Sequence, residues 1–291
     1  MKSYNGQRNL DRNTKLKKVC CLKGLPNLSR RRKDPRFSFD EAFREYDEVR
    51  PGYPKELIED IIQISGICKG GKILEVGCGT GQATLAFAGL GYSMLCLDIG
   101  RKLVEVAREK CQDYPNVELL CRSFEDWEPE KKTFDLLISA TAFHWIQPEV
   151  GYPKAKEVLK DTGYIALFWN LHPTPYTAFF KDVQRVYRQV VPEWRAPIDT
   201  QEFEKTIRER KTFISKTGLF KKVQAKRYPW LKVYSTKQYL KLLNTFSDHR
   251  SLEASKRDQL YAVIRNLIEE EYGGSIVRPY LSVLYIAKKN V

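Results

Sequence analysis

The stretch from Lys72 to Asp98 reads KILEVGCGTGQATLAFAGLGYSMLCLD, and the fold prediction starts from it. It begins with a short apolar run, 73–76, which is typical of a buried strand. Three glycines at every second position come next: Gly77, Gly79 and Gly81. Apolar residues at helical spacing follow, and Gly91 stands where a glycine often follows a helix. A second apolar run, 94–97, ends at Asp98. Strand, glycine turn, helix, strand and acid together predict one βαβ unit.

Each part of this unit has a physical use. Glycines let a turn approach a ligand closely, because they have no Cβ and tolerate positive φ. The N–H groups at the start of the next helix point into the same crevice. Asp98, at the carboxyl end of its strand, can accept hydrogen bonds from two ribose hydroxyls, and open α/β sheets bind ligands at those strand ends. The unit predicts a nucleoside-containing ligand.

The glycine spacing separates two kinds of nucleotide site. The dinucleotide fingerprint is G-x-G-x-x-G, whereas this chain has G-x-G-x-G and Gln82 next. The segment 75–81 closely resembles the nucleotide-binding motif of the class I S-adenosylmethionine-dependent methyltransferases, which implies S-adenosylmethionine as cofactor. The alternative is a glycine turn used only for packing. The cofactor-binding residues that the resemblance implies are Glu75, Gly77, Gly79, Gly81, Asp98, Ser123, Phe124 and Ala140.

The adenine contact departs from the family pattern. These methyltransferases often carry an acidic residue after the third strand, where this chain has Ser123. Phe124 could lie against the adenine ring, and Glu125 or Asp126 could replace the missing acid.

The segment before the glycine strand also resembles a family. The string Phe43-x-x-Tyr46-x-x-x-Arg50-Pro51-x-Tyr53-Pro54 is similar to the pre-core segment of small-molecule methyltransferases related to the trans-aconitate enzyme, in which it covers the cofactor pocket. The alternative is a packing helix with an exposed arginine. The resemblance implies a substrate-side or lid group consisting of Tyr46, Arg50, Tyr53 and Trp145.

A histidine follows the fourth predicted strand, in the run Ala140-Thr141-Ala142-Phe143-His144-Trp145. Enzymes that methylate exocyclic base amines typically have Asn/Asp-Pro-Pro-aromatic here, so that chemistry is disfavoured. His144 is the candidate catalytic residue because an unperturbed imidazole titrates near ~6.5. It could act as a base, hydrogen-bond the substrate, or only order the loop.

The rest of the chain predicts an α/β fold, a seven-stranded doubly wound, Rossmann-like methyltransferase sheet. The later strands are expected at 117–121, 134–140, 163–169, 219–230 and 279–288. Helices are expected at 57–64, 103–111 and 154–160, with helical insertions after the fifth and sixth strands at about 172–212 and 236–271. One methyltransferase domain would then cover 37–291, preceded by a basic, largely disordered extension over 1–36.

Composition limits the other classes of function. No apolar run approaches the ~20 residues that span a bilayer, and no secretory signal is evident, so we expect a cytoplasmic protein without membrane contact. The seven cysteines include no Cys-x-x-Cys pair, which argues against structural zinc and predicts no metal site. The net charge is +14, of which the extension carries +10 and the other residues +4. The basic character therefore belongs mainly to the extension.

Three functions remain. The first is methyl transfer to a small, anionic metabolite by a monomer or homodimer. The second is an RNA or protein methyltransferase that uses the basic extension as a tether, although the near absence of aromatic residues there disfavours nucleic acid. The third is a cofactor-binding module without catalysis, because fold alone does not prove activity.

Overall fold

The structure is a computed structural model that describes residues 47–172, 177–194 and 200–291. The predicted extension over 1–36 and the lid candidate Tyr46 lie outside these ranges.

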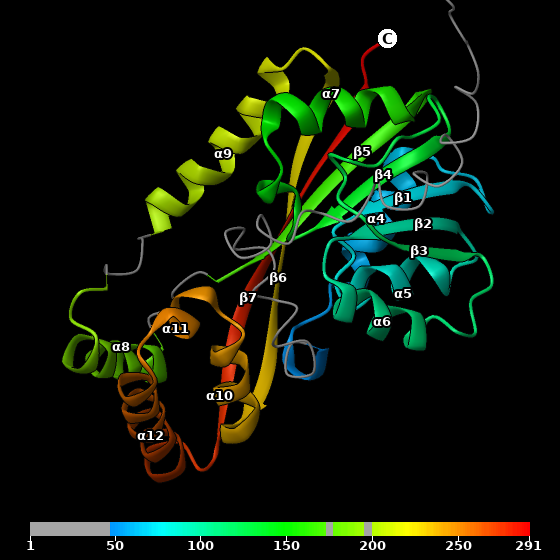
Figure 1. The fold of residues 1–291 in the computed structure, drawn as a ribbon. Coiled ribbons are helices and arrows are strands. Elements are labelled where there is room, and N and C mark those ends of the chain that lie inside the picture. The colour runs from blue at the N-terminus through cyan, green and yellow to red at the C-terminus, as the bar shows by residue number, and fades with distance from the viewer. Residues whose placement is uncertain (1–46, 173–176, 195–199) are drawn as a thin grey trace, which may run out of the picture.

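The centre of the molecule is a seven-stranded sheet in the order β3-β2-β1-β4-β5-β7-β6 (Figure 1). The first five strands are parallel, and β7 runs antiparallel to both of its neighbours. This is the doubly wound sheet that the sequence predicts. The strands are β1 Lys72–Val76, β2 Ser93–Asp98, β3 Val117–Cys121, β4 Phe134–Ala140, β5 Leu159–Leu171, β6 Phe220–Ser235 and β7 Ser275–Lys289.

Helices cover both faces of this sheet, which is why its central strands are nearly continuous apolar runs. One face packs against α4 Lys55–Ser65, α5 Gln82–Ala88 and α6 Arg101–Lys110. The other packs against α7 Pro148–Val158 and α9 Thr200–Lys216 (Figure 1). Gly91, with φ 84°, closes the turn after α5 by donating to the Ala88 carbonyl at 2.9 Å.

A third core lies beside the sheet, where β6 and β7 continue past the end of β5. It is covered by a helical cap, which consists of α8 Ala178–Val190, α10 Thr236–Asn244, α11 Ser247–Ser251 and α12 Ala254–Glu271 (Figure 1). A capping box between Ser235 and Gln238 starts α10 directly at the end of β6. The predicted second insertion is therefore three helices rather than one stretch.

Several predicted boundaries differ from the structure: β6 extends to Ser235, β7 begins already at Ser275, and the boundary between α7 and β5 is shifted. The helix expected at 154–160 begins at Pro148 instead, because proline fits the first helical position, where no N–H is needed. β5 begins at Leu159, inside the range expected for that helix.

Candidate functional site

The glycine turn lies at the carboxyl ends of β1 and β2. Gly77 and Cys78 both donate their N–H groups to the Leu97 carbonyl, at 2.8 and 3.1 Å. Gly77 has φ 76°, and a Cβ built on it would lie 2.2 Å from the Ala142 Cβ in the loop after β4. Glycine is therefore required here twice, for its backbone conformation and for the close approach of a second loop.

Asp98 holds this turn from the end of β2. Its Oδ2 accepts from the Gly79 N–H at 2.9 Å and its Oδ1 from the Gly100 N–H at 2.8 Å. A carboxylate has about four acceptor positions, and Asp98 also lines the cavity described next.

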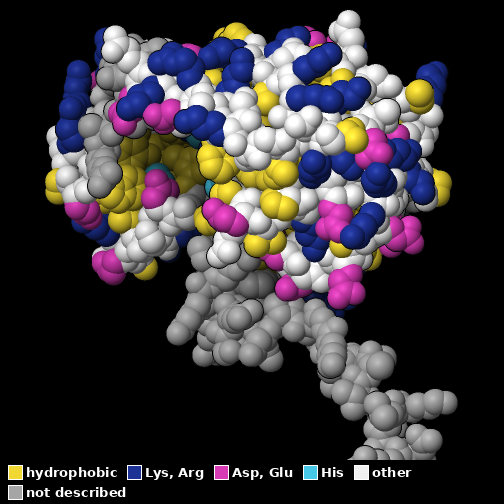
Figure 2. Space-filling model, turned by 90° about the horizontal axis from the view of Figure 1, so that it is seen from above, with side chains coloured by type: hydrophobic (Ala, Val, Ile, Leu, Met, Phe, Trp, Pro, Cys, Tyr) yellow, Lys and Arg dark blue, Asp and Glu magenta, His cyan; other side chains and the backbone are white. Residues whose placement is uncertain are grey.

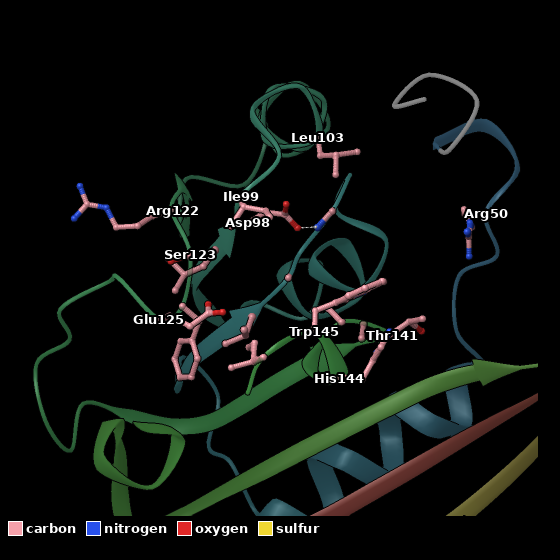
Figure 3. A pocket seen from close by; sticks show the side chains of 18 residues that line it. Arg50, Asp98, Ile99, Leu103, Arg122, Ser123, Glu125, Thr141, His144 and Trp145 are labelled. Atoms are coloured by element: carbon pink, nitrogen blue, oxygen red, sulfur yellow. Dashed lines mark hydrogen bonds between the residues drawn. The ribbon is translucent and has the colours of Figure 1, made fainter. Parts of the chain in front are cut away.

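A cavity lies over these strand ends, between the loops that follow β1, β2, β3 and β4. We call it the first cavity. Figure 3 shows Ser123 and Glu125 on one side of Asp98, and Thr141, His144 and Trp145 on the other. Of the predicted site residues, this cavity brings together Arg50, Gly77, Gly79, Asp98, Ser123, Phe124, Ala140, His144 and Trp145.

A second cavity shares the glycine turn and Ala140 with the first, and extends toward α4 and the end of β5. It adds the predicted residues Glu75 and Tyr53 to the lining, together with Asn170 and His172. Because the two cavities share part of their walls, one elongated ligand could occupy both. Gly81 lines neither; with φ 85° it forms the N-cap of α5.

Glu75 provides an unsatisfied acceptor at the second cavity. Its Oε2 accepts from the Thr84 hydroxyl at 2.6 Å and from the Cys96 thiol, whereas the buried Oε1 has no hydrogen-bond partner. Complete burial raises the pKa of Glu75 to about 7. An ammonium group in this cavity would meet the acceptor that the protein leaves unpaired.

At the predicted adenine contact, the Ser123 hydroxyl already has hydrogen-bond partners. It donates to Asp126 Oδ2 at 2.9 Å and accepts from the Asp126 N–H at 3.0 Å. Of the two acids that could replace the missing family residue, Glu125 lines the first cavity. Phe124 lines it too, although most of its ring packs against Trp127 and Phe143.

His144 lies in a short 3₁₀ helix, Phe143–Trp145, that faces the first cavity. Its Nδ1 accepts a hydrogen bond from the Trp169 indole N–H at 3.1 Å. Indole nitrogen only donates, so the neutral imidazole carries its proton on Nε2.

The surroundings of His144 keep its ring neutral. The residue is exposed toward the cavity, but its ring packs against Trp145 and Trp169, with centroids 5.0 and 6.3 Å away. Arg210 of α9 lies 4.1 Å from the Trp169 ring. Burial of the ring, and secondarily the Arg210 charge, lower the pKa of His144 to about 4.

Tyr53 and Arg50 hold the segment before α4 over the strand ends. The Tyr53 hydroxyl lies 2.8 Å from the Thr141 hydroxyl, while Asn170 Nδ2 donates to the Gly52 carbonyl at 2.8 Å. The Arg50 guanidinium donates to the Thr245 hydroxyl and carbonyl of the helical cap, at 3.0 and 2.9 Å.

Sequence reasoning missed three residues of this wall: Thr141, Asn170 and His172. Thr141 has φ 56°, an uncommon conformation for a β-branched residue, which re-aims the chain where β4 ends. The available signal was position, since Thr141 and Asn170 directly follow predicted strands and His172 directly follows the observed end of β5. Within the described ranges, no group of three or more His, Cys, Asp or Glu residues could hold a metal ion.

Comparisons with known proteins agree with this geometry. Residues 73–163 match the family described as "Methyltransferase domain". The uncharacterized methyltransferase Rv3342 of Mycobacterium tuberculosis is 27% identical over 139 residues, 48% of this chain and 54% of that protein. The match thus spans about half the length of that relative. The uncharacterized methyltransferase C25B8.09 of Schizosaccharomyces pombe is 24% identical over 234 residues, 80% of this chain and 87% of that protein.

A relative with a named substrate matches over a shorter range. Malonyl-[acyl-carrier protein] O-methyltransferase 1 of Ilyobacter polytropus is 38% identical over 93 residues, 31% of this chain and 34% of that protein. Among solved structures, a protein of Anaeromyxobacter dehalogenans assigned as a type II methyltransferase aligns with TM-score 0.55 and 19% identity. That alignment covers 82% of this chain and 96% of the other. It confirms the fold.

Proposed function

We propose that this chain, which contains a class I S-adenosylmethionine-dependent methyltransferase domain, transfers the methyl group of that cofactor to a small, anionic acceptor. The observation that carries the proposal is that the two cavities adjoin at the glycine turn, with Asp98 in the lining of the first. An elongated nucleoside ligand and an acceptor can meet there.

The residues present fit the cofactor at both ends. Asp98 would accept from the ribose hydroxyls, and the unpaired Glu75 Oε1 faces the end where an α-ammonium group belongs. Phe124 and Glu125 would receive the adenine ring. When bound, S-adenosylmethionine supplies an electrophilic methyl group on a sulfonium.

The protein's own contribution is mainly alignment. The glycine turn, Asp98 and Glu75 would hold the cofactor, and its sulfonium would supply the methyl group: the bond to the acceptor oxygen would form as the carbon–sulfur bond breaks, and the electron pair of the broken bond would stay on sulfur. Holding the reactants in line can contribute roughly 7–11 kcal/mol of the barrier. A carboxylate acceptor already has the required electron pair, so it needs no base.

An enclosed, apolar site supports a small acceptor. Figure 2 shows one face of the molecule, on which Lys and Arg side chains are interspersed with Asp and Glu around a hollow with a hydrophobic wall. This mixed distribution of charge differs from the continuous basic surface expected of a nucleic-acid groove. No helix in ranges 47–172, 177–194 and 200–291 is long and apolar enough to cross a membrane. We propose a cytoplasmic location on the grounds of composition.

We propose that His144 donates a hydrogen bond from Nε2 to the acceptor oxygen rather than removing a proton. The Trp169 N–H occupies Nδ1, so the tautomer presents a donor to the cavity. His144→Phe is expected to lower kcat/KM about 10- to 100-fold, because a hydrogen bond to a charged group contributes ~1.5–3 kcal/mol. His144→Gln, which keeps an amide donor, is the control and should retain more activity.

The pH profile separates the two roles of His144. A base titrating near ~6.5 would produce an acidic limb in kcat/KM at that pH. With a pKa of about 4, the ring stays neutral well below pH 6.5, so we expect no such limb. Between pH 4 and ~6.5, His144 is protonated in the unfolded state but neutral in the folded state. The free energy of unfolding is therefore expected to decrease as pH falls from 6.5 toward 4. A limb near 6.5 that disappears in His144→Gln would instead identify a base.

The basic extension favours a second candidate, an RNA or protein acceptor, because it carries most of the net charge. We expect a protein that begins at Phe37 to match the full chain in cofactor affinity, thermal midpoint and methylation of a metabolite extract. The measurement is transfer of labelled methyl groups, with and without nuclease. Label that appears only in nuclease-sensitive material, and is lost with residues 1–36, would move the protein to the RNA-methylating class.

A further inference from the structure

A buried arginine contacts two of the aromatic rings on which His172 packs, those of Phe246 and Tyr280. Arg278, on β7, is only 8% exposed. One terminal nitrogen donates to the Tyr239 hydroxyl at 3.3 Å, while its Nε has no hydrogen-bond partner. Among the described residues no carboxylate forms an ion pair with it. A buried charge without a counter-ion is costly, and proteins rarely keep one unless it has a use.

Aromatic rings surround this guanidinium but compensate it only in part. Four ring centroids lie 5.6–5.8 Å away, near the outer limit for a cation–π contact: those of Phe180, Tyr239, Phe246 and Tyr280. The tyrosine hydroxyls accept from the terminal nitrogens of the guanidinium, but they carry no negative charge and leave Nε without a partner.

His172 connects Arg278 to the second cavity. It lines that cavity, and its ring packs on Tyr280 and Phe246 at 5.0 and 5.7 Å, the same two rings that Arg278 contacts. Its buried Nδ1 also has no partner. Burial, and then the charges of Arg278 and Arg50, hold the pKa of His172 well below its ordinary value. Arg50 itself lies 5.0 Å from the Phe246 ring and lines both cavities.

We propose that Arg50 and His172, which line the second cavity, form an anion subsite with the buried charge of Arg278 behind them, and that this subsite holds a carboxylate of the acceptor. Arg278 supplies the buried charge, and the fork of a guanidinium matches a carboxylate. The neutral imidazole of His172 can add a hydrogen bond. The subsite rests on the proposed function for the identity of its ligand, but its charge and unpaired atoms do not depend on methyl transfer.

The test is calorimetric titration of the full chain with acetate, glutarate and tricarballylate, with and without S-adenosylhomocysteine. The neutral diamide glutaramide serves as the control ligand. We expect at least one carboxylate to bind saturably and glutaramide not to bind. Arg278→Met should weaken carboxylate binding at least tenfold while leaving S-adenosylhomocysteine affinity unchanged. Equal carboxylate binding by Arg278→Met, or no saturable binding of any of the three by the folded wild type, would overturn the subsite.

A second variant separates a binding role from a packing role. Lys289 is a buried cation on the same strand, but it is paired, with the Leu159 carbonyl at 2.7 Å and Asp161 at 3.2 Å. Lys289→Met should lower the thermal midpoint, whereas Arg278→Met should leave it unchanged or raise it. A lower midpoint in Arg278→Met, with carboxylate affinity retained, would assign Arg278 to packing.

The wild type provides a readout that needs no variant. A bound carboxylate would offset the Arg278 and Arg50 charges, which contribute to the low pKa of His172. The pKa of His172 should therefore rise when the carboxylate is added. Imidazole ¹⁵N spectra follow this change directly. An unchanged His172 signal at saturating carboxylate would place the anion elsewhere. Failure of the proposed function would show separately, as absence of S-adenosylhomocysteine binding.

Discussion

Asp98→Ala is expected to lower the affinity for S-adenosylmethionine at least tenfold. The substitution removes the acceptor for two ribose hydroxyls, and hydrogen bonds to a charged group contribute ~1.5–3 kcal/mol each. It also removes the acceptor of the Gly79 and Gly100 N–H groups, so the glycine turn loses its support. Calorimetry with S-adenosylmethionine measures both losses together.

Two variants control this result. Asp98→Asn keeps one acceptor oxygen without the charge, so its affinity should fall between wild type and Asp98→Ala. Asp135 also accepts a backbone N–H, from Lys72 at 2.9 Å, but it lies at the opposite end of the sheet. Asp135→Ala should affect stability and leave cofactor affinity unchanged. If Asp98→Ala binds as well as wild type, the ribose assignment is wrong.

Gly77→Ala is the second change with a large expected effect. A non-glycine residue at positive φ costs of order 1–3 kcal/mol, and here the added methyl group would also lie 2.2 Å from the Ala142 Cβ. That distance is impossible, so the loop after β4 must move away from the first cavity. We expect a lower thermal midpoint together with a loss of cofactor affinity, measured by thermal melting and calorimetry.

Two further variants separate the backbone strain at Gly77 from the clash with Ala142. Gly91 also has positive φ, 84°, but a Cβ there would meet nothing within 4 Å. Gly91→Ala should therefore cost stability alone. Adding Ala142→Gly to Gly77→Ala removes the clash but not the backbone strain, and should restore part of the cofactor affinity. Equal effects of Gly77→Ala and Gly91→Ala on binding would refute the close approach as the cause.

The sequence alone was enough to predict the sheet and half of the site. The glycine turn and Asp98 lie within one βαβ unit of 27 residues, where local spacing determines which groups meet. Apolar runs of strand length predicted the central strands, because strands buried on both faces are apolar throughout, whereas the edge strand β6 is largely exposed and carries several Lys and Arg residues. The helical cap was harder to predict from the sequence. Its helices pack their apolar side chains against one another, so periodicity located the helical segment from 236 to 271 but not its breaks.

Only the tertiary structure decided the other half of the site. The tautomer of His144 depends on Trp169, which is 25 residues away, and its pKa depends on Arg210 of a separate helix. Arg278 looks like an ordinary charged residue in the sequence, because burial and a missing counter-ion are properties of packing. Hydrogen-bond partners and counter-ions are set by contacts between distant segments, and no local pattern encodes them. The sequence therefore determined that the glycine turn and Asp98 meet at one edge of the sheet, and the packing of α9 and the helical cap determined which charges lie near the two cavities.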